Sequence, residues 1–313
     1  MRIKARTKET IAAYGFLAPN LIGFMVFTFI PVFISLALSF FKWDILTPPQ
    51  FVGFENFVKL LGFHKDAITN QVVANDPKFW QYLWNTVFLM FSIPICMMAS
   101  LFLAIILNRK IKGQTAFRTL FYLPSICPMV AIAILWMWIL NAEYGMINNI
   151  IYWFGRFLGF SNLQGPGWLV SPGWAKPSLM LMGFWMAIGG TNMILYLAAL
   201  QGIPRDLFEA ADIDGANGWQ KFWAITWPQI SPTTFFIFIM NIIGGFQGGF
   251  VQAYVMTGGG PGGATTTMEY YIFSNLFDWG KVGYASTIAW FVFIVVFIVT
   301  LISWKYGGKV VHY

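Results

Sequence analysis

The stretch "RDLFEAADIDGANGWQKF", residues 205–222, concentrates charge in a chain that is otherwise strongly apolar. The chain has 313 residues, of which 58% are hydrophobic and only 12 are acidic. Four of those acids lie within nine consecutive positions of this stretch, at Asp206, Glu209, Asp212 and Asp214. Long segments with almost no charge lie on both sides. The pattern therefore predicts a short, water-exposed helix between two membrane-spanning segments.

The rest of the chain has the composition of a membrane protein. Charged residues make up 10% of the sequence, whereas about a quarter of the residues in a soluble domain are charged. A helix that crosses the bilayer needs about 20 consecutive apolar residues. The alternative, a large soluble core, would require amphipathic surface helices that the sequence lacks. We therefore predict an all-α integral membrane protein with six transmembrane helices, at about residues 12–41, 83–107, 119–141, 177–200, 231–254 and 282–304.

Basic residues predict the orientation. If the N-terminus is cytoplasmic, 12 of the 19 Lys and Arg fall on the cytoplasmic side, as the positive-inside rule requires. Residues 1–11 then form a cytoplasmic N-terminus, 12–308 the transmembrane domain and 309–313 a cytoplasmic tail. The first span follows a basic start like that of a signal peptide, but it is too long and lacks a small-residue cleavage site. The net charge of +7 indicates this topology and an attraction to anionic membrane lipid, and no nucleic-acid partner is expected.

Residues 203–230 predict two helices joined by a tight turn. Pro204 suits the first helical position, and the acids that follow suit the positive end of the helix dipole. Gly215 can end the first helix in a left-handed conformation, and Asn217 can cap the second. Four acids beside the small side chains Ala210 and Ala211 favour a projection that inserts into a groove of another protein. An ordinary capped loop helix is the alternative.

No catalytic or cofactor site is expected on this chain. The stretch "TGGGPGGATTT" (257–267) lacks the lysine of a phosphate-binding loop, and no such motif occurs elsewhere. His64 and His312 lie on loops predicted on opposite sides of the membrane, and Cys96 and Cys127 lie within spans as packing residues. We therefore predict no enzyme activity, no metal and no bound ATP here.

The predicted spans contain neutral hydrogen-bonding groups rather than ionisable ones. Such groups suit an uncharged polar solute, although each can equally serve helix–helix bonding. The glycines of "NIIGGFQGGF" (241–250) permit either close helix packing or a substrate path. The candidate lining residues are Asn192, Tyr196, Asn241 and Gln247.

The run around Glu209 resembles the EAA loop of bacterial ABC-importer permeases. Glu209, Ala210, Ala211, Gly215, Ile225 and Pro228 match its pattern. The fuller form of the sugar-permease branch, which includes maltose-type and glycerol-phosphate-type subunits, is matched at Asp214, Ala216 and Phe222; Trp227 departs from the usual leucine. "TGGGPGGATTT" with "YYIF", and "FVGFENFVKLL" with "FWQYLWNT", are also similar to that branch, so the resemblance covers nearly the whole chain.

The resemblance implies a permease subunit of the bacterial plasma (inner) membrane. Its partners would be a dimer of ABC ATPase subunits, which bind ATP and Mg, a second homologous permease and an extracytoplasmic sugar-binding protein. The EAA helix between spans four and five would dock in a cleft of the ATPase, where Glu209 would pair with a basic group. The residues that the resemblance assigns to ATPase coupling are Glu209, Ala210, Ala211, Asp214 and Gly215.

Three other functions remain as alternatives. A permease for glycerol phosphate or another polar solute would share this architecture, but an anionic solute favours basic groups within the spans. A secondary transporter or channel would need coupling-ion ligands or a pore ring. A membrane enzyme would need a clustered nucleophile, metal ligands or an acid–base pair. The sequence shows none of these features.

Overall fold

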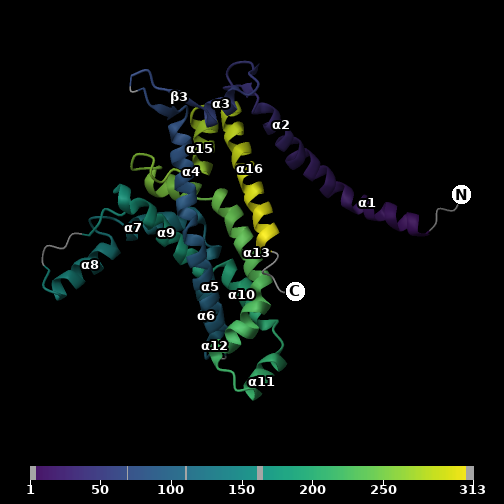
Figure 1. Ribbon diagram of the computed structural model, residues 1–313, viewed down its shortest axis with the longest axis vertical. Helices are drawn as coiled ribbons and strands as arrows, with labels where there is room; N and C mark the ends of the chain where they lie inside the picture. The colour runs from purple at the N-terminus through teal and green to yellow at the C-terminus, as the bar shows by residue number, and fades with distance from the viewer. Residues whose placement is uncertain (1–4, 69, 110, 161–164, 308–313) are drawn as a thin grey trace. The chain divides into compact units, whose positions relative to one another are not determined.

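A computed structural model describes residues 5–68, 70–109, 111–160 and 165–307. These residues are mostly helical, which confirms the predicted all-α class (Figure 1). They form two compact units: residues up to Asp76 with Ile272–Phe291, and Pro77–Tyr271 with the segment from Val292 onward. The predicted tail at 309–313 and the first four residues lie outside the described residues.

Five described helices or helix runs are long and apolar enough to cross a membrane. The helix pair α6 and α7 would make a sixth if it forms one broken span. The five long segments are Thr7–Leu38, Pro77–Asn108, Pro172–Gln201, Gly218–Phe246 and Val282–Lys305.

The first unit combines a long N-terminal helix with two small hairpins that the sequence did not predict. Its elements are α1 (Ala5–Phe24), a π-helical turn (Met25–Phe29), α2 (Ile30–Leu38), β1 (Phe41–Lys42), β2 (Gln50–Phe51), α3 (Glu55–Leu61), β3 (Phe63–Lys65), β4 (Val72–Ala74) and a second π-helical turn (Ser274–Asp278). β1 pairs antiparallel with β2, and β3 pairs antiparallel with β4. The buried Asn56 amide joins α3 to the end of α2 and to β1, because it donates to the carbonyls of Ser39 and Phe41 at 2.9 and 3.0 Å.

The second unit contains the helices that form its core and line its cavities. They are α4 (Pro77–Met90), α5 (Ser92–Asn108), α6 (Gln114–Ile126), α7 (Met129–Ile139), α8 (Met146–Phe157), α9 (Pro172–Ile188), α10 (Thr191–Gln201), α11 (Arg205–Ile213), α12 (Gly218–Lys221), a π-helical turn (Phe222–Thr226), α13 (Trp227–Phe246), α14 (Phe250–Gln252) and a further π-helical turn (Ala253–Thr257). By sequence, α15 (Met268–Phe273) and α16 (Val282–Gly307) belong partly to each unit.

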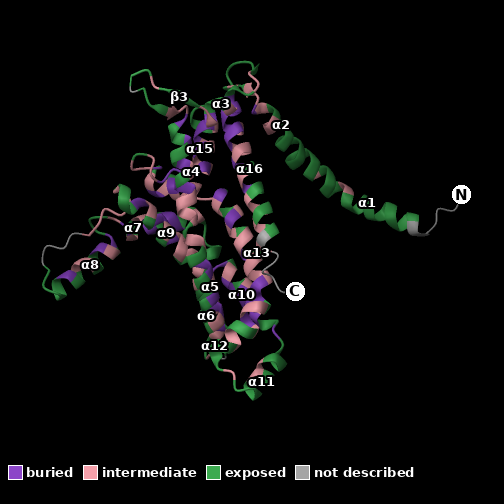
Figure 2. Ribbon diagram, viewed as in Figure 1, coloured by how far each residue is buried: buried purple, intermediate pink, exposed green. Residues whose placement is uncertain are grey.

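The core of the second unit lies where α5, α10 and α13 pack together. Buried Leu, Ile and Met side chains of these helices surround Tyr196, which is 1% exposed. Figure 2 shows the buried residues along the inner sides of these helices and exposed residues on their outer sides. A second apolar cluster joins α7 to α9 through Trp136 and Met182.

The predicted third span, 119–141, is two helices rather than one. The axes of α6 and α7 differ by 98°, with the break at Cys127 and Pro128. Proline lacks the backbone N–H that would continue the helical ladder, and it forces the preceding residue out of the helical region. Cys127 accordingly has an extended backbone, with ψ at 144°.

Candidate translocation cavity and coupling helix

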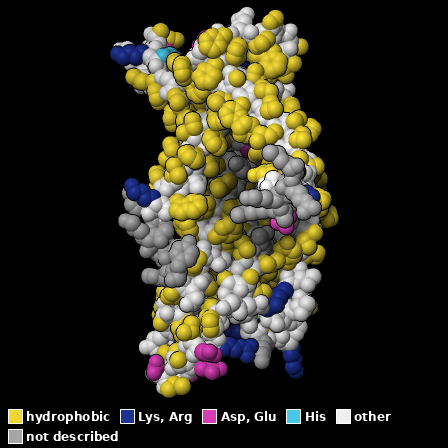
Figure 3. Space-filling model, turned by 90° about the vertical axis from the view of Figure 1, so that its right-hand side faces the viewer, with side chains coloured by type: hydrophobic (Ala, Val, Ile, Leu, Met, Phe, Trp, Pro, Cys, Tyr) yellow, Lys and Arg dark blue, Asp and Glu magenta, His cyan; other side chains and the backbone are white. Residues whose placement is uncertain are grey.

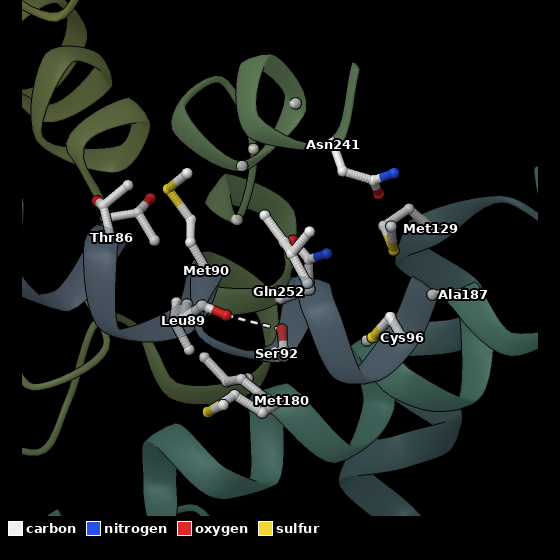
Figure 4. Close-up of a pocket in the computed structure, with 18 of the residues that line it drawn as sticks. Thr86, Leu89, Met90, Ser92, Cys96, Met129, Met180, Ala187, Asn241 and Gln252 are labelled. Atoms are coloured by element: carbon white, nitrogen blue, oxygen red, sulfur yellow. Dashed lines mark hydrogen bonds between the residues drawn. The ribbon is translucent and has the colours of Figure 1, made fainter. Parts of the chain in front are cut away.

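A cavity of about 430 Å³ lies in the second unit among α4, α5, α9 and α13. Its volume falls in the range of small-molecule sites. Much of its wall is apolar, from Leu, Ile and Met side chains, and Asn241 and Gln252 add amide groups (Figure 4). The described lining residues include no charged side chain. The cavity can therefore accept an uncharged group with both apolar faces and hydrogen-bonding edges.

The glycines of α13 differ in what surrounds them. A Cβ atom at Gly245 would come within 2.8 Å of the Met90 side chain, so this glycine allows α13 to approach α4 closely. A Cβ atom at Gly244 would meet nothing within 4 Å, and Gly244 lines the cavity. One side of this segment therefore packs against a neighbouring helix, while the other side leaves open space.

Asn241 is the one predicted lining residue that borders the cavity. Its amide exchanges hydrogen bonds with that of Asn192 on α10, at 3.2 and 3.4 Å, and also donates to the Ile237 carbonyl at 2.7 Å. The Asn192–Asn241 pair thus links α10 to α13 beside the cavity. Asn192 itself contributes to this link rather than to the lining.

The other two predicted lining residues lie elsewhere. Tyr196 is packed inside the core of α5, α10 and α13. Gln247 is exposed at the C-terminal end of α13 and is not among the cavity residues. Gln252, five positions later, reaches the cavity because the chain breaks at Gly248 and Gly249 and restarts as α14. The sequence reasoning missed Gln252, although the adjacent pair of glycines marked the break that directs it inward.

The glycine-rich loop 257–267 is fastened to α4. Asn85, which is buried, donates to the carbonyls of Gly263 and Thr266 at 2.8 and 3.0 Å. The Thr86 hydroxyl accepts from the N–H of Met268 at 2.9 Å, and the exposed Gln81 donates to the Gly262 carbonyl at 3.0 Å. Thr86 itself lines the cavity, and Asn85 precedes it on α4, so the loop and the cavity wall share an anchor. The loop is therefore a turn held to α4 by hydrogen bonds.

Glu269 on α15 binds the chain directly after the break between α13 and α14. Its carboxylate accepts a hydrogen bond of 3.0 Å from the N–H of Phe250, the first residue of α14. Glu269 lies outside the five long apolar segments. Burial raises the pKa of its carboxyl group, and the bond from Phe250 partly opposes that effect. No sequence motif had singled out this residue.

α11 ends in the turn that the sequence predicted. Gly215 has φ at +75°, its N–H donates to the Asp212 carbonyl at 3.1 Å, and the N–H of Ala216 donates to the Ala211 carbonyl at 2.9 Å. This pair of bonds is a Schellman motif, which stops a helix sharply. Pro204, predicted at the first helical position, is instead the residue immediately before α11, with ψ at 135°.

The next helix begins with the predicted cap. The side chain of Asn217 accepts from the N–H of Gln220, and the side chain of Gln220 accepts from the N–H of Asn217, at 3.0 and 2.8 Å. This capping box fixes α12 close behind the Gly215 turn. Asp212 forms an ion pair with Lys221 of α12. One acid of the predicted cluster therefore holds the two helices together.

The remaining acids face outward from α11. Asp206, Glu209 and Asp214 are exposed, as are Ala210 and the large apolar side chain of Ile213. Phe208 turns the other way and packs against the core. Figure 3 shows acidic and basic side chains gathered at the lower end of the molecule, where Figure 1 places α11. α11 therefore presents a compact surface with acidic groups around small and apolar residues.

Comparison with known proteins decides the family. Residues 92–306 match the model of the family described as binding-protein-dependent transport system inner membrane component. The chain belongs to this family. It is therefore a transporter permease subunit and a multi-pass protein of the inner membrane, as the EAA-loop resemblance implied.

This inner membrane component has relatives of nearly its own length. It is 37% identical to the "Probable ABC transporter permease protein YesP" of Bacillus subtilis, over 98% of the chain and 93% of the relative. It is 34% identical to the lactose transport system permease protein LacF of Rhizobium radiobacter, over 92% and 91%. It is 31% identical to the sn-glycerol-3-phosphate transport system permease protein UgpA of Brucella abortus, over 99% of each.

The permease also has the fold of a solved transporter chain. It superposes with a TM-score of 0.80 on a chain of a bacterial ABC transporter involved in the import of the acidic polysaccharide alginate, at 24% identity and over 99% of both chains. In a structure of the alginate ABC transporter in complex with alginate pentasaccharide-bound periplasmic protein, the matching chain gives a TM-score of 0.81. At this identity the likeness establishes the fold alone.

Proposed function

We propose that this permease carries an uncharged sugar or oligosaccharide across the membrane. The observation that supports the solute class is the cavity beside α13, whose lining combines amide and hydroxyl groups with apolar side chains and contains no charge among the described lining residues. Sugar rings offer hydroxyl edges and apolar C–H faces, which match such a wall. The lactose permease among the relatives is consistent with this solute class.

The proposed topology has six spans and two cytoplasmic termini. In it, α6 and α7 together make the third span, broken at Cys127 and Pro128. Broken helices occur at membrane depth where protein or a water-filled cavity satisfies the freed backbone groups. α11 then lies on the cytoplasmic side between the fourth and fifth spans, and the loop 257–267 lies outside.

The proposed partners follow from that arrangement. An extracytoplasmic binding protein delivers the sugar, a second homologous permease completes the transmembrane path, and two ABC ATPase subunits bind ATP and Mg. α11 docks in a cleft of one ATPase subunit, where Glu209 meets a basic group and Ala210 permits close approach. Support comes from the exposure of this face and from the Gly215 turn that fixes its shape.

The transport step is a change between two states of the assembled permease pair. ATP binding closes the ATPase dimer and moves the docked α11 helices, which favours the outward-facing state, and hydrolysis restores the inward-facing state. ATP drives this change because it binds the two states unequally. In this chain, α11 transmits the motion to the core through Phe208 and through its link to α12.

Co-purification tests the coupling role. An affinity-tagged chain, expressed with its partner subunits, is purified in nanodiscs as wild type and as Glu209→Lys. We expect an ATPase and a second permease to co-purify with wild type, and the ATPase alone to be lost from the variant. Glu143→Lys, the same charge change at an exposed loop position, is the matched control. Equal ATPase recovery with all three proteins would refute docking through Glu209.

Competition tests the solute class. The sn-glycerol-3-phosphate permease matches this chain over nearly its full length, as the lactose permease does. An anionic solute is therefore the alternative that the experiment must exclude. Uptake of a radiolabelled sugar identified on the binding protein is measured in proteoliposomes with excess unlabelled neutral disaccharide or glycerol phosphate. We expect inhibition by neutral sugars. Inhibition by glycerol phosphate and not by neutral sugars would show that the permease carries an anionic solute.

A further inference from the structure

α8 is amphipathic with its apolar face outward. Trp153 and Phe157 are 63% and 76% exposed, and Met146, Ile150 and Phe154 on the same face are also exposed. Asn148 and Gly155, on the opposite face, are buried. A helix on a water-exposed surface shows the reverse arrangement. Figure 2 shows the exposed residues along α8 at the end of α7 and α9.

Hydrogen bonds on the buried face fix this orientation. The Asn148 amide donates to the Ala142 carbonyl at 2.8 Å and accepts from the indole N–H of Trp168 at 2.7 Å. Rolling the helix to cover Trp153 would break the bonds of a fully buried amide, which is costly. The hydrogen bonds of Asn148 therefore hold α8 with its apolar face outward.

The outward face of α8 continues an exposed apolar stripe on α7. On α7, the buried residues Ile132 and Trp136 pack toward α9, while Val130, Ile134 and Trp138 are exposed along the other side. α7 belongs to a helix pair apolar enough to span the membrane, so its exposed stripe meets acyl chains or another apolar surface. The stripe leads into a groove of about 840 Å³, lined by Leu135, Trp138 and Ile139 of α7 and by Met146, Ile150 and Trp153 of α8.

We propose that α8 lies in the membrane–water interface and that the α7–α8 groove holds an acyl chain of a phospholipid. The groove is almost entirely apolar, and its lining includes Trp and Tyr, the side chains that collect at headgroup level. Arg156, exposed in the last turn of α8, supplies a cation for the phosphate that a chain in the groove would bring with it. This site is distinct from the proposed solute cavity and does not depend on the solute.

Spin-label accessibility tests the placement of α8. Cys96 and Cys127, the native cysteines, are replaced by alanine, and single cysteines are introduced as Ile150→Cys and Phe157→Cys. Two matched sites calibrate the measurement: Ile134→Cys on the exposed stripe of α7, and Glu143→Cys on the exposed loop before α8. The whole transporter is placed in nanodiscs of phosphatidylethanolamine and phosphatidylglycerol, and the labels are relaxed with oxygen, which enters hydrocarbon, or with a nickel chelate, which stays in water.

Labels at Ile150 and Phe157 should respond as the label at Ile134 does, with oxygen more effective than nickel. A nickel response like that at Glu143 would place α8 in water and overturn the proposal. An immobilised label that neither reagent reaches would show that a protein subunit covers the face, and would also overturn it.

Quenching by labelled lipid tests the groove itself. A bimane fluorophore is attached through Ile150→Cys in the same cysteine-free background, and the nanodiscs receive phosphatidylcholine with a doxyl group on its acyl chain. Occupancy by an acyl chain predicts stronger quenching at Ile150 than at Glu143, and at least as strong as at Ile134. Quenching at Ile150 no greater than at Glu143 would exclude a lipid chain from the groove.

Discussion

Glu269 accepts a hydrogen bond from the backbone N–H of Phe250, 19 residues earlier in the chain, at 3.0 Å. The bond joins α15 to the first residue of α14, directly after the break at Gly248 and Gly249. Gly248 and Gly249 line the cavity, so this carboxylate is bonded to the residue that directly follows two lining positions. Its charge sits in a half-buried site, where the ionised form is disfavoured.

The first prediction concerns the pH dependence that Glu269 creates. Burial raises the pKa of this carboxyl above its ordinary value of 4.5. A raised folded-state pKa means that the group's contribution to stability is complete below pH 4.5 and is lost as pH rises through the folded-state pKa. Glu269→Gln mimics the neutral form and can still accept from Phe250. We expect its advantage in melting temperature over wild type to be absent at pH 4 and to grow toward pH 8.

Thermal melts of the detergent-purified protein at several pH values check this expectation. Glu269→Ala is the control, because it removes the charge and the acceptor together and should melt below Glu269→Gln at every pH. A melting difference between Glu269→Gln and wild type that stays constant across the pH range would show that the carboxyl titrates normally.

The second prediction concerns the anchor of the glycine-rich loop. Asn85→Ala removes the donor for two loop carbonyls, at Gly263 and Thr266. Leaving buried acceptors without a donor costs about 1–3 kcal/mol, so the variant should melt lower and its loop amides should exchange faster with deuterium. Gln81→Ala removes one exposed bond to the same loop and should change stability by less than about 0.5 kcal/mol. Unchanged exchange in 257–267 of the Asn85 variant would show that the loop is held by other contacts.

The third prediction tests the cavity as the solute path. Gly183 of α9 and Gly244 of α13 both line the cavity, and a Cβ at either position meets nothing within 4 Å. Leucine at either site projects into the open space, and leucine favours a helix more than glycine does. We expect Gly183→Leu and Gly244→Leu to insert and melt normally but to lose uptake in proteoliposomes. Gly173→Leu, on an open and exposed face of α9 outside the cavity, should transport normally. Normal uptake by both cavity variants would place the path elsewhere.

The sequence predicted local features well where a residue type favours one backbone conformation or one cap. The left-handed turn at Gly215 and the cap at Asn217 follow from short-range backbone geometry, and the structure has both. The length and apolarity of helices are also local properties, so five long apolar segments were foreseeable. Pro128 indicated that the helix could break where α6 and α7 meet. The size of the bend, 98°, could not be predicted from it, because membrane helices often tolerate proline without so large a bend.

Features that depend on distant partners could not be derived from the pattern. Tyr196 and Asn241 are both polar residues within predicted spans, yet one is sealed in the core and the other borders the cavity. The difference depends on which face of each helix meets its neighbours. Glu269 was overlooked because its significance lies in a bond to Phe250, and nothing in the local sequence signals that bond.

The last prediction tests the shape of the proposed ATPase-docking surface on α11 separately from its charge. Gly215 has φ at +75°, a conformation that costs a residue with a side chain about 1–2 kcal/mol and is worst for β-branched residues. No atom crowds its Cβ position, so any effect of substitution comes from the backbone. Gly215→Val should therefore loosen the Schellman turn without disturbing the core, and should weaken recovery of the ATPase by about 5–30-fold. Gly215→Asn should keep most of the recovery, because asparagine tolerates the left-handed region.

Gly218→Val is the matched control, since Gly218 lies three residues away, also has an open Cβ position and has no positive φ. Its ATPase recovery should equal that of wild type. The comparison separates two models of α11. If a rigid shape is required, Gly215→Val fails while all three carboxylates on the exposed face remain in place. If Gly215→Val recovers the ATPase as well as Gly218→Val does, charge at Glu209 is sufficient and the turn serves only to end the helix.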